Sequence, residues 1–113
     1  VSIQNHSFRA QVVETESEKQ KGLGGQKAIC SDCGMLFFFD KPGKYSFWMK
    51  DMLFAIDILW IMDGKIISIE KNVLPSFSGT MRPAENANRV LEIKAGAVDS
   101  LGISLGDSVL IEN

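Results

Sequence analysis

Apolar and polar residues alternate in short runs along most of the chain, and these runs are rich in β-branched and aromatic side chains. Runs of this kind, bounded by Gly, Pro, Asp and Asn, are typical of β-strands. They predict about eight short strands, at residues 1–4, 7–13, 34–40, 45–49, 54–62, 65–74, 89–94 and 107–113. We expect the first two to form a hairpin around Asn5 and His6.

Cap and turn residues separate several of these runs. Thr15 is followed three residues later by Glu18 and then by glycines, which predicts a helix of about two turns with a capping box. Asp63-Gly64 is a strong hairpin signal, so we expect residues 54–62 to pair antiparallel with residues 65–74.

Three further segments are predicted from turn residues and weak periodicity. Residues 40–44 are expected to form a turn between strands, residues 75–88 a long surface loop, and residues 95–103 one helical turn. The fold class that follows is mainly β with one or two short helices, in one domain spanning residues 1–113. Closely spaced strands favour a small closed or nearly closed antiparallel barrel, because closure removes exposed edges.

One apolar run carries charges. Residues 47–64 are almost continuously apolar yet include Lys50, Asp51 and Asp57. Crossing a membrane takes roughly 20 apolar residues, and each charge near the centre costs about 2.5–3.5 kcal/mol, which excludes a transmembrane segment here. Alternation along residues 54–62 puts Asp57 on an apolar strand face, so it needs a partner, and Lys50 and Arg89 are the candidate cations.

Overall charge argues against a nucleic-acid partner. The chain has 12 basic and 14 acidic residues, a net charge of -2, and no basic block. We expect a monomer that binds a small molecule or a protein. The chain begins at Val1 without Met, so we expect that a preceding segment was cleaved or omitted, and that the protein is exported or associated with the cell envelope, with a cytoplasmic location as the alternative.

The two cysteines form one CxxC motif, Cys30 and Cys33. Zinc needs four ligands, and there is no second cysteine pair and only one histidine, so no metal site or cofactor is expected. A local disulfide or free thiols in a surface loop is the favoured interpretation. Cu(I) handling by Met49, Met52 and this pair is an alternative, because thioethers and thiolates suit Cu(I), whereas methionines more often fill core gaps.

Catalysis has few candidate residues. Asp57 and Glu92 both lie within apolar strands, where a raised pKa would suit a general acid or base. An enzyme using this acid-base pair is therefore one hypothesis. A structural role is the competing hypothesis, because buried acids usually accept backbone hydrogen bonds or pair with a base.

Five segments together resemble one family: GMLFFF at 34–39, FWMKDM at 47–52, IDILWI at 56–61, VLEIKAG at 90–96 and LGISLGDSV at 101–109. Their order and spacing are similar to the domain of unknown function 192 family, also called uncharacterised protein family 0127. The resemblance implies a prokaryotic, mainly β domain, often found behind a signal peptide or lipid anchor, with no established reaction. One segment differs: the family has Gly-Leu-Met, an aromatic residue and Arg, where this chain has residues 22–26, GLGGQ.

We therefore expect a non-catalytic binding module of the cell envelope. Apolar clefts with a few convergent polar groups are typical of ligand sites, and Trp and Met are enriched at protein interfaces. The candidate ligand-binding residues are Met35, Trp48, Met49, Lys50, Asp57 and Glu92.

Overall fold

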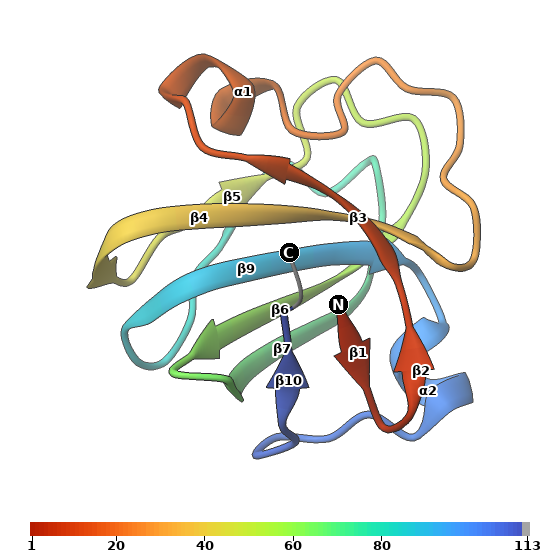
Figure 1. Ribbon diagram of the computed structural model, residues 1–113. Coiled ribbons are helices and arrows are strands. Elements are labelled where there is room, and N and C mark those ends of the chain that lie inside the picture. Colours follow the sequence, from red (N-terminus) through yellow and green to blue (C-terminus); the bar gives the residue numbers. More distant parts are fainter. Residues whose placement is uncertain (112–113) are drawn as a thin grey trace.

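The computed structural model describes residues 1–111, which are built around one five-stranded sheet (Figure 1). Its strand order is β3 (Arg9–Val13), β4 (Cys33–Gly43), β9 (Ala87–Lys94), β6 (Ile56–Met62) and β7 (Lys65–Val73). β3 runs parallel to β4, and the other neighbours are antiparallel. The parallel pair is possible because α1 (Glu16–Lys21) and a long loop return the chain between the two strands.

Smaller elements cover the two faces of this sheet. On one side lie β1 (Ser2–Ile3), β2 (His6–Ser7) and β10 (Val109–Leu110), which form a three-stranded sheet, together with α2 (Ala97–Leu101) (Figure 1). The other face is covered by the loop after α1 and by the two-stranded sheet of β5 (Phe47–Trp48) and β8 (Thr80–Met81).

Both faces of the central sheet are buried, and β6 shows this most clearly. Ile56, Ile58 and Trp60 pack with Leu23, Met35, Phe37 and Met49 in what we call the α1-side core. Leu59 and Ile61 pack with Ile3, Phe8, Val98 and Ile103 in the α2-side core. The predicted alternation along residues 54–62 is confirmed, and double-sided burial explains why the run is almost continuously apolar.

The central sheet is open, with β3 and β7 at its edges. The mainly β class is confirmed. We predicted a closed or nearly closed antiparallel barrel, and no closed barrel is found among residues 1–111. A parallel β3–β4 pair replaces the expected antiparallel neighbour, and the edge of β7 is joined to the C-terminal segment by one isolated antiparallel bridge, Lys65 to Ser108. No helix in the described part of the chain is long and apolar enough to span a membrane.

The strongest local signals are confirmed. Met62 pairs with Lys65 across Asp63 and Gly64, which both have positive φ, 49° and 77°, as a tight hairpin turn requires. Thr15 caps α1 with the full capping box, and residues 95–103 contain α2.

Other boundaries differ from the prediction. β4 continues through the predicted turn at residues 40–43, with a register shift between Phe38 and Gly43 that accommodates Pro42. The predicted loop 75–88 contains β8, and the strand expected at 107–113 is only Val109–Leu110 in the described part, residues 112–113 lying outside it.

Candidate functional site

An open groove runs between α1 and the segment 44–53; we call it the α1 groove. It consists of two adjoining hollows, of about 440 Å³ and about 840 Å³, which share Gln20 and Trp48. The first is also lined by Glu16, Lys19, Phe39, Lys44, Tyr45, Ser46, Phe47 and Thr80, and the second by Ser17, Lys21, Gly24, Gly25, Lys50, Asp51 and Leu53. These volumes lie in the range of small-molecule sites.

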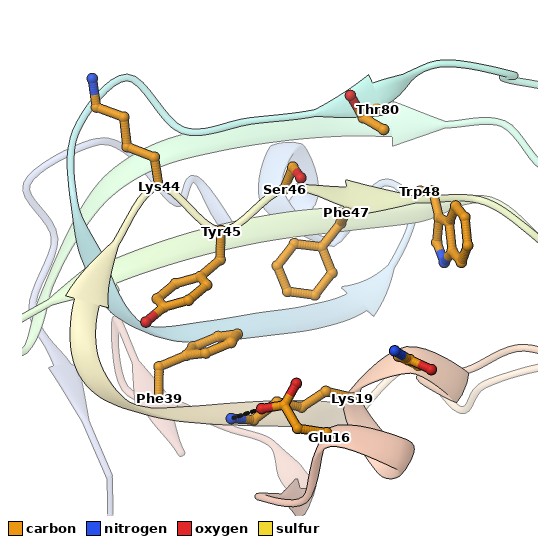
Figure 2. Close-up of a pocket in the computed structure, with 10 residues that line it drawn as sticks. Glu16, Lys19, Phe39, Lys44, Tyr45, Ser46, Phe47, Trp48 and Thr80 are labelled. Carbon is orange, nitrogen blue, oxygen red and sulfur yellow. Dashed lines mark ion pairs between the residues drawn. The ribbon is translucent and has the colours of Figure 1, made fainter.

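Aromatic rings form one wall of the first hollow. Figure 2 shows the rings of Phe39 and Tyr45 facing each other at one end and Trp48 at the other; the first two stack with centroids 3.7 Å apart. The Tyr45 hydroxyl donates to the Lys41 carbonyl at 2.6 Å, and the Tyr45 carbonyl accepts the indole N–H of buried Trp60 at 2.9 Å. The wall is therefore held from both sides before any ligand binds.

Trp48 is an exposed aromatic side chain of the groove, with 53% of its surface accessible. The Lys50 Nζ lies 5.3 Å from the centre of its ring, a cation–π contact. In the same groove, the Lys19 Nζ lies 4.3 Å from the Phe39 ring centre and 4.0 Å from a Glu16 oxygen. Each aromatic platform thus has an ammonium group beside it.

The loop after α1 builds the far wall of the second hollow. The Gly25 N–H donates to the Asp51 carbonyl at 2.8 Å, and Asp51 has a positive φ of 62°. A Cβ on Gly24 would lie 2.9 Å from the Lys21 carbonyl oxygen, which is too close for van der Waals contact. It would lie 3.5 Å from the Lys50 carbonyl oxygen, which is an ordinary contact distance. Gly24 therefore lets the loop turn tightly against the end of α1, and the Gly25 N–H ties the loop to Asp51.

Lysines outnumber carboxylates along the groove. Lys19, Lys21, Lys44 and Lys50 line it against Glu16 and Asp51. The groove therefore favours a ligand that carries negative charge.

Of the six candidate ligand-binding residues, the structure brings only Trp48 and Lys50 to this surface. Met35 and Met49 are 2% and 3% exposed and pack in the α1-side core, beneath the groove. Trp48 and Lys50 lie in the segment that the sequence singled out, and alternation along this segment turns Met49 inward.

Asp57 is fully buried and has a structural role. Its two carboxylate oxygens accept the backbone N–H groups of Asn72 at 2.8 Å and Val98 at 2.9 Å. The first lies in an irregular part of β7 with positive φ, and the second belongs to the first turn of α2, whose own N-cap residue offers no side-chain bond. The prediction that Lys50 or Arg89 pairs with Asp57 is wrong, because Lys50 lies over Trp48 and Arg89 stacks on Phe38.

Glu92 is also buried, on the α1 side of the sheet. It pairs in register with Met35 and Ile58, and its Oε1 would lie 3.9 Å from a Cβ on Gly22. Burial raises the pKa of this carboxyl group to about 8, so at neutral pH it mostly carries a proton.

The proposed acid-base pair of Asp57 and Glu92 is contradicted. Asp57 is opposite Ile93 and Ile58 is opposite Glu92 in the β6–β9 ladder, so the two carboxyl groups point to opposite faces of the central sheet. The sequence could not show this, because the face on which each carboxyl group lies depends on how β6 and β9 pair. The two groups cannot act together in one cleft.

Cys30 and Cys33 form a disulfide at the start of β4. As a disulfide, the pair offers no thiolate to Cu(I), and Met49 and Met52 are buried among apolar neighbours. No group of three or more His, Cys, Asp or Glu side chains suited to a metal ion occurs within residues 1–111.

Sequence reasoning missed most of the groove. Lys19 and Gln20 lie on a short helix whose charge pattern predicted a solvated face, although Lys19 packs over Phe39. Lys44 and Tyr45 follow a strand that ends later than predicted. One signal could have indicated part of the groove: Tyr45 lies two residues before the segment 47–64 that the sequence singled out. Nothing local indicated that α1 would face it.

Comparisons place the chain among known sequences and structures. The model of the DUF192 family, described as "Uncharacterized ACR", matches residues 1–111. A crystal structure of a protein of unknown function from Novosphingobium aromaticivorans is similar, with a TM-score of 0.89 and 30% identity, over 92% of this chain and 75% of that one. So is that of a proposed transcription regulator from Sinorhizobium meliloti, with a TM-score of 0.85 and 33% identity, over 88% and 78%. No curated protein matches. The chain belongs to the DUF192 family.

Proposed function

We propose that this chain is a non-catalytic binding module of the cell envelope that holds an acidic oligosaccharide in the α1 groove. The observation that carries the proposal is the exposed Trp48 ring with the Lys50 ammonium beside it, at the junction of two hollows. A pyranose ring packs its C–H face on an indole and leaves its hydroxyl and carboxylate groups free. Lysines and Gln20 then lie within the groove to meet them.

The shape of the site favours an elongated ligand. The aromatic pair Phe39 and Tyr45 lies at one end of the first hollow and Trp48 at the other, so a ligand that spans the hollow contacts aromatic side chains at both ends (Figure 2). Both hollows are lined by lysine, carboxylate and hydroxyl or amide side chains as well as by aromatic ones, which suits a hydrated ligand better than a fully apolar one.

A binding role is supported over catalysis by the carboxyl groups. Both carboxylate oxygens of Asp57 accept backbone N–H groups. Glu92 lies under the loop after α1, on the face of the sheet opposite to that of Asp57. An envelope location is supported by the Cys30–Cys33 disulfide, because disulfides persist in oxidising compartments.

Binding is tested by titration calorimetry with oligogalacturonate, the uncharged galactose oligomer of equal length serving as the neutral probe. Trp48→Ala should weaken oligogalacturonate binding by about tenfold, and Lys50→Met by about threefold to tenfold, because stacking and a nearby cation each contribute roughly 0.5–2 kcal/mol. Lys27→Met is the matched control, since this exposed lysine lines neither hollow.

Fluorescence gives an independent readout. The chain has two tryptophans, of which Trp48 is exposed and Trp60 is 0% exposed, so ligand-induced quenching should disappear in Trp48→Phe. Absence of binding, equal binding of the neutral oligomer, or binding unchanged in both groove variants would contradict the proposal. Saturable capture of an unstructured acidic peptide instead would assign the groove to a protein partner.

A further inference from the structure

A second surface feature lies away from the α1 groove. The Cys30–Cys33 disulfide stands in a depression of about 250 Å³ that shares no lining residue with either hollow of the groove. Arg9 of β3, Gln11 and Gln26 form its polar rim. Cys30 is exposed and Cys33 is half-buried, so Cys30 is the more accessible residue of the pair.

A guanidinium group faces both sulfurs. The Arg9 Nη2 lies 3.8 Å from the Cys30 Sγ and 4.0 Å from the Cys33 Sγ. The position is set by the sheet, because Arg9 is directly opposite Cys33 in the parallel β3–β4 pair. A neighbouring cation stabilises a thiolate, and a more stable thiolate leaves a disulfide faster.

The acidic residue of the motif is engaged elsewhere. Asp32 lies between the cysteines in sequence, and its Oδ1 lies 3.0 Å from the His6 Nε2. Its carboxylate therefore lies beside β2, and Arg9 is the charged group found in contact with the sulfurs within the described residues.

Backbone hydrogen bonds hold the turn around the disulfide independently of the S–S bond. The turn is also held by the Cys33 N–H bonded to the Cys30 carbonyl at 3.1 Å, and by the Arg9 N–H bonded to the Asp32 carbonyl at 2.7 Å. The bridge joins residues only three apart in sequence, so it does not clamp distant elements. A bond with these properties can open and close without unfolding the sheet.

We propose that Cys30–Cys33 is a thiol-exchange site whose substrate is a dithiol. A thiolate of the dithiol attacks the Cys30 Sγ; the S–S bond breaks, and its electron pair leaves on the Cys33 Sγ as a thiolate beside Arg9. The second thiolate of the dithiol then attacks the first sulfur of the same dithiol, which is bonded to the Cys30 Sγ in the mixed disulfide, and releases the Cys30 thiolate. The dithiol loses two electrons as it becomes a disulfide, and the protein gains them as two thiols.

The rate of reduction tests this directly. Oxidised full-length protein is mixed with dithiothreitol at pH 7, and thiols are trapped and counted by mass spectrometry. Arg9→Gln should slow reduction by about tenfold, Arg9→Lys should retain most of the rate, and the exposed Arg82→Gln serves as the matched control. An Arg9→Gln rate equal to wild type, or a wild-type rate no faster than that of a CSDC peptide disulfide, overturns the proposal.

The site of attack gives a second test that needs no variant. Brief exposure to glutathione, acid quenching and fragment sequencing locate the mixed disulfide in the wild-type chain. Glutathione on Cys30 supports the assigned order of attack, and glutathione on Cys33 overturns it. The variants Cys33→Ser and Cys30→Ser each keep one thiol and are mixed with oxidised glutathione, whose S–S bond that thiolate attacks with release of one glutathione thiolate. The Cys30 thiolate of Cys33→Ser should react about tenfold faster than the Cys33 thiolate of Cys30→Ser.

Discussion

Glu92 shows at the scale of one residue how burial turns an acid into a pH-dependent element of stability. The folded chain holds a proton on Glu92 up to a pKa of about 8, whereas the unfolded chain releases it near 4.5. Between these values the native state binds one proton more than the unfolded state, so the free energy of unfolding contributed by this residue falls as pH rises. Above about pH 8 the contribution is constant.

Glu92→Gln removes this titration. We expect the difference in unfolding free energy, wild type minus variant, to fall by about 1.4 kcal/mol per pH unit between pH 5 and 8. Urea unfolding at four pH values measures it, with the exposed Glu70→Gln as the control for a general charge effect. A difference that stays flat across this window would show that the carboxyl group is ionised in the folded state.

At the scale of elements, Asp57 joins three of them. From β6 it binds the N–H of Asn72 in β7 and the N–H of Val98 in α2. Replacing it by alanine leaves two N–H groups without their acceptor, and an unmet buried donor costs about 1–3 kcal/mol. We expect Asp57→Ala to lower the unfolding free energy by about 2–5 kcal/mol, measured by urea denaturation.

A matched comparison separates this capping role from charge alone. Asp40→Ala removes an exposed acid and should change stability by less than about 0.5 kcal/mol. Amide exchange at Asn72 and Val98 should accelerate in Asp57→Ala more than at Leu59 in the same strand. Uniform acceleration at all three sites would argue that the variant loosens the whole sheet rather than these two junctions.

Elements were predictable where the signal is local. The Asp63-Gly64 turn, the Thr15 capping box and the apolar alternation in residues 54–62 each depend on a few neighbouring residues, and each is confirmed. Features that depend on distant pairing were missed. Two-residue β8 exists because it pairs with β5, and the open sheet follows from the parallel return of the chain to β4.

The same distinction applies to the candidate site. Trp48 and Lys50 could be proposed from the sequence because they lie in one unusual segment. Their groove requires α1 to face that segment, and the Asp57–Glu92 pair fails because register puts them on opposite faces. Side-chain partners across a sheet cannot be assigned until the pairing of strands is known.

At the scale of the whole molecule, two cores share one sheet. β6 and β9 supply side chains to both: Trp60 and Val90 to the α1-side core, Leu59 and Leu91 to the α2-side core. Successive residues of each strand alternate between the two cores, so both cores pack on the same strands. Loss of packing in one core would therefore disturb the strands on which the other core packs. The molecule should therefore unfold in a single cooperative transition.

Three probes test this in Trp48→Phe, where the remaining tryptophan emission comes from buried Trp60. Trp60 reports the α1-side core, the methyl signals of Ile103 report the α2-side core, and far-UV circular dichroism reports the strands. All three urea transitions should coincide, as for other small two-state domains. An Ile103 transition at a lower urea concentration would mean that α2 and the small sheet of β1, β2 and β10 detach first. The α1-side core alone would then stabilise the central sheet.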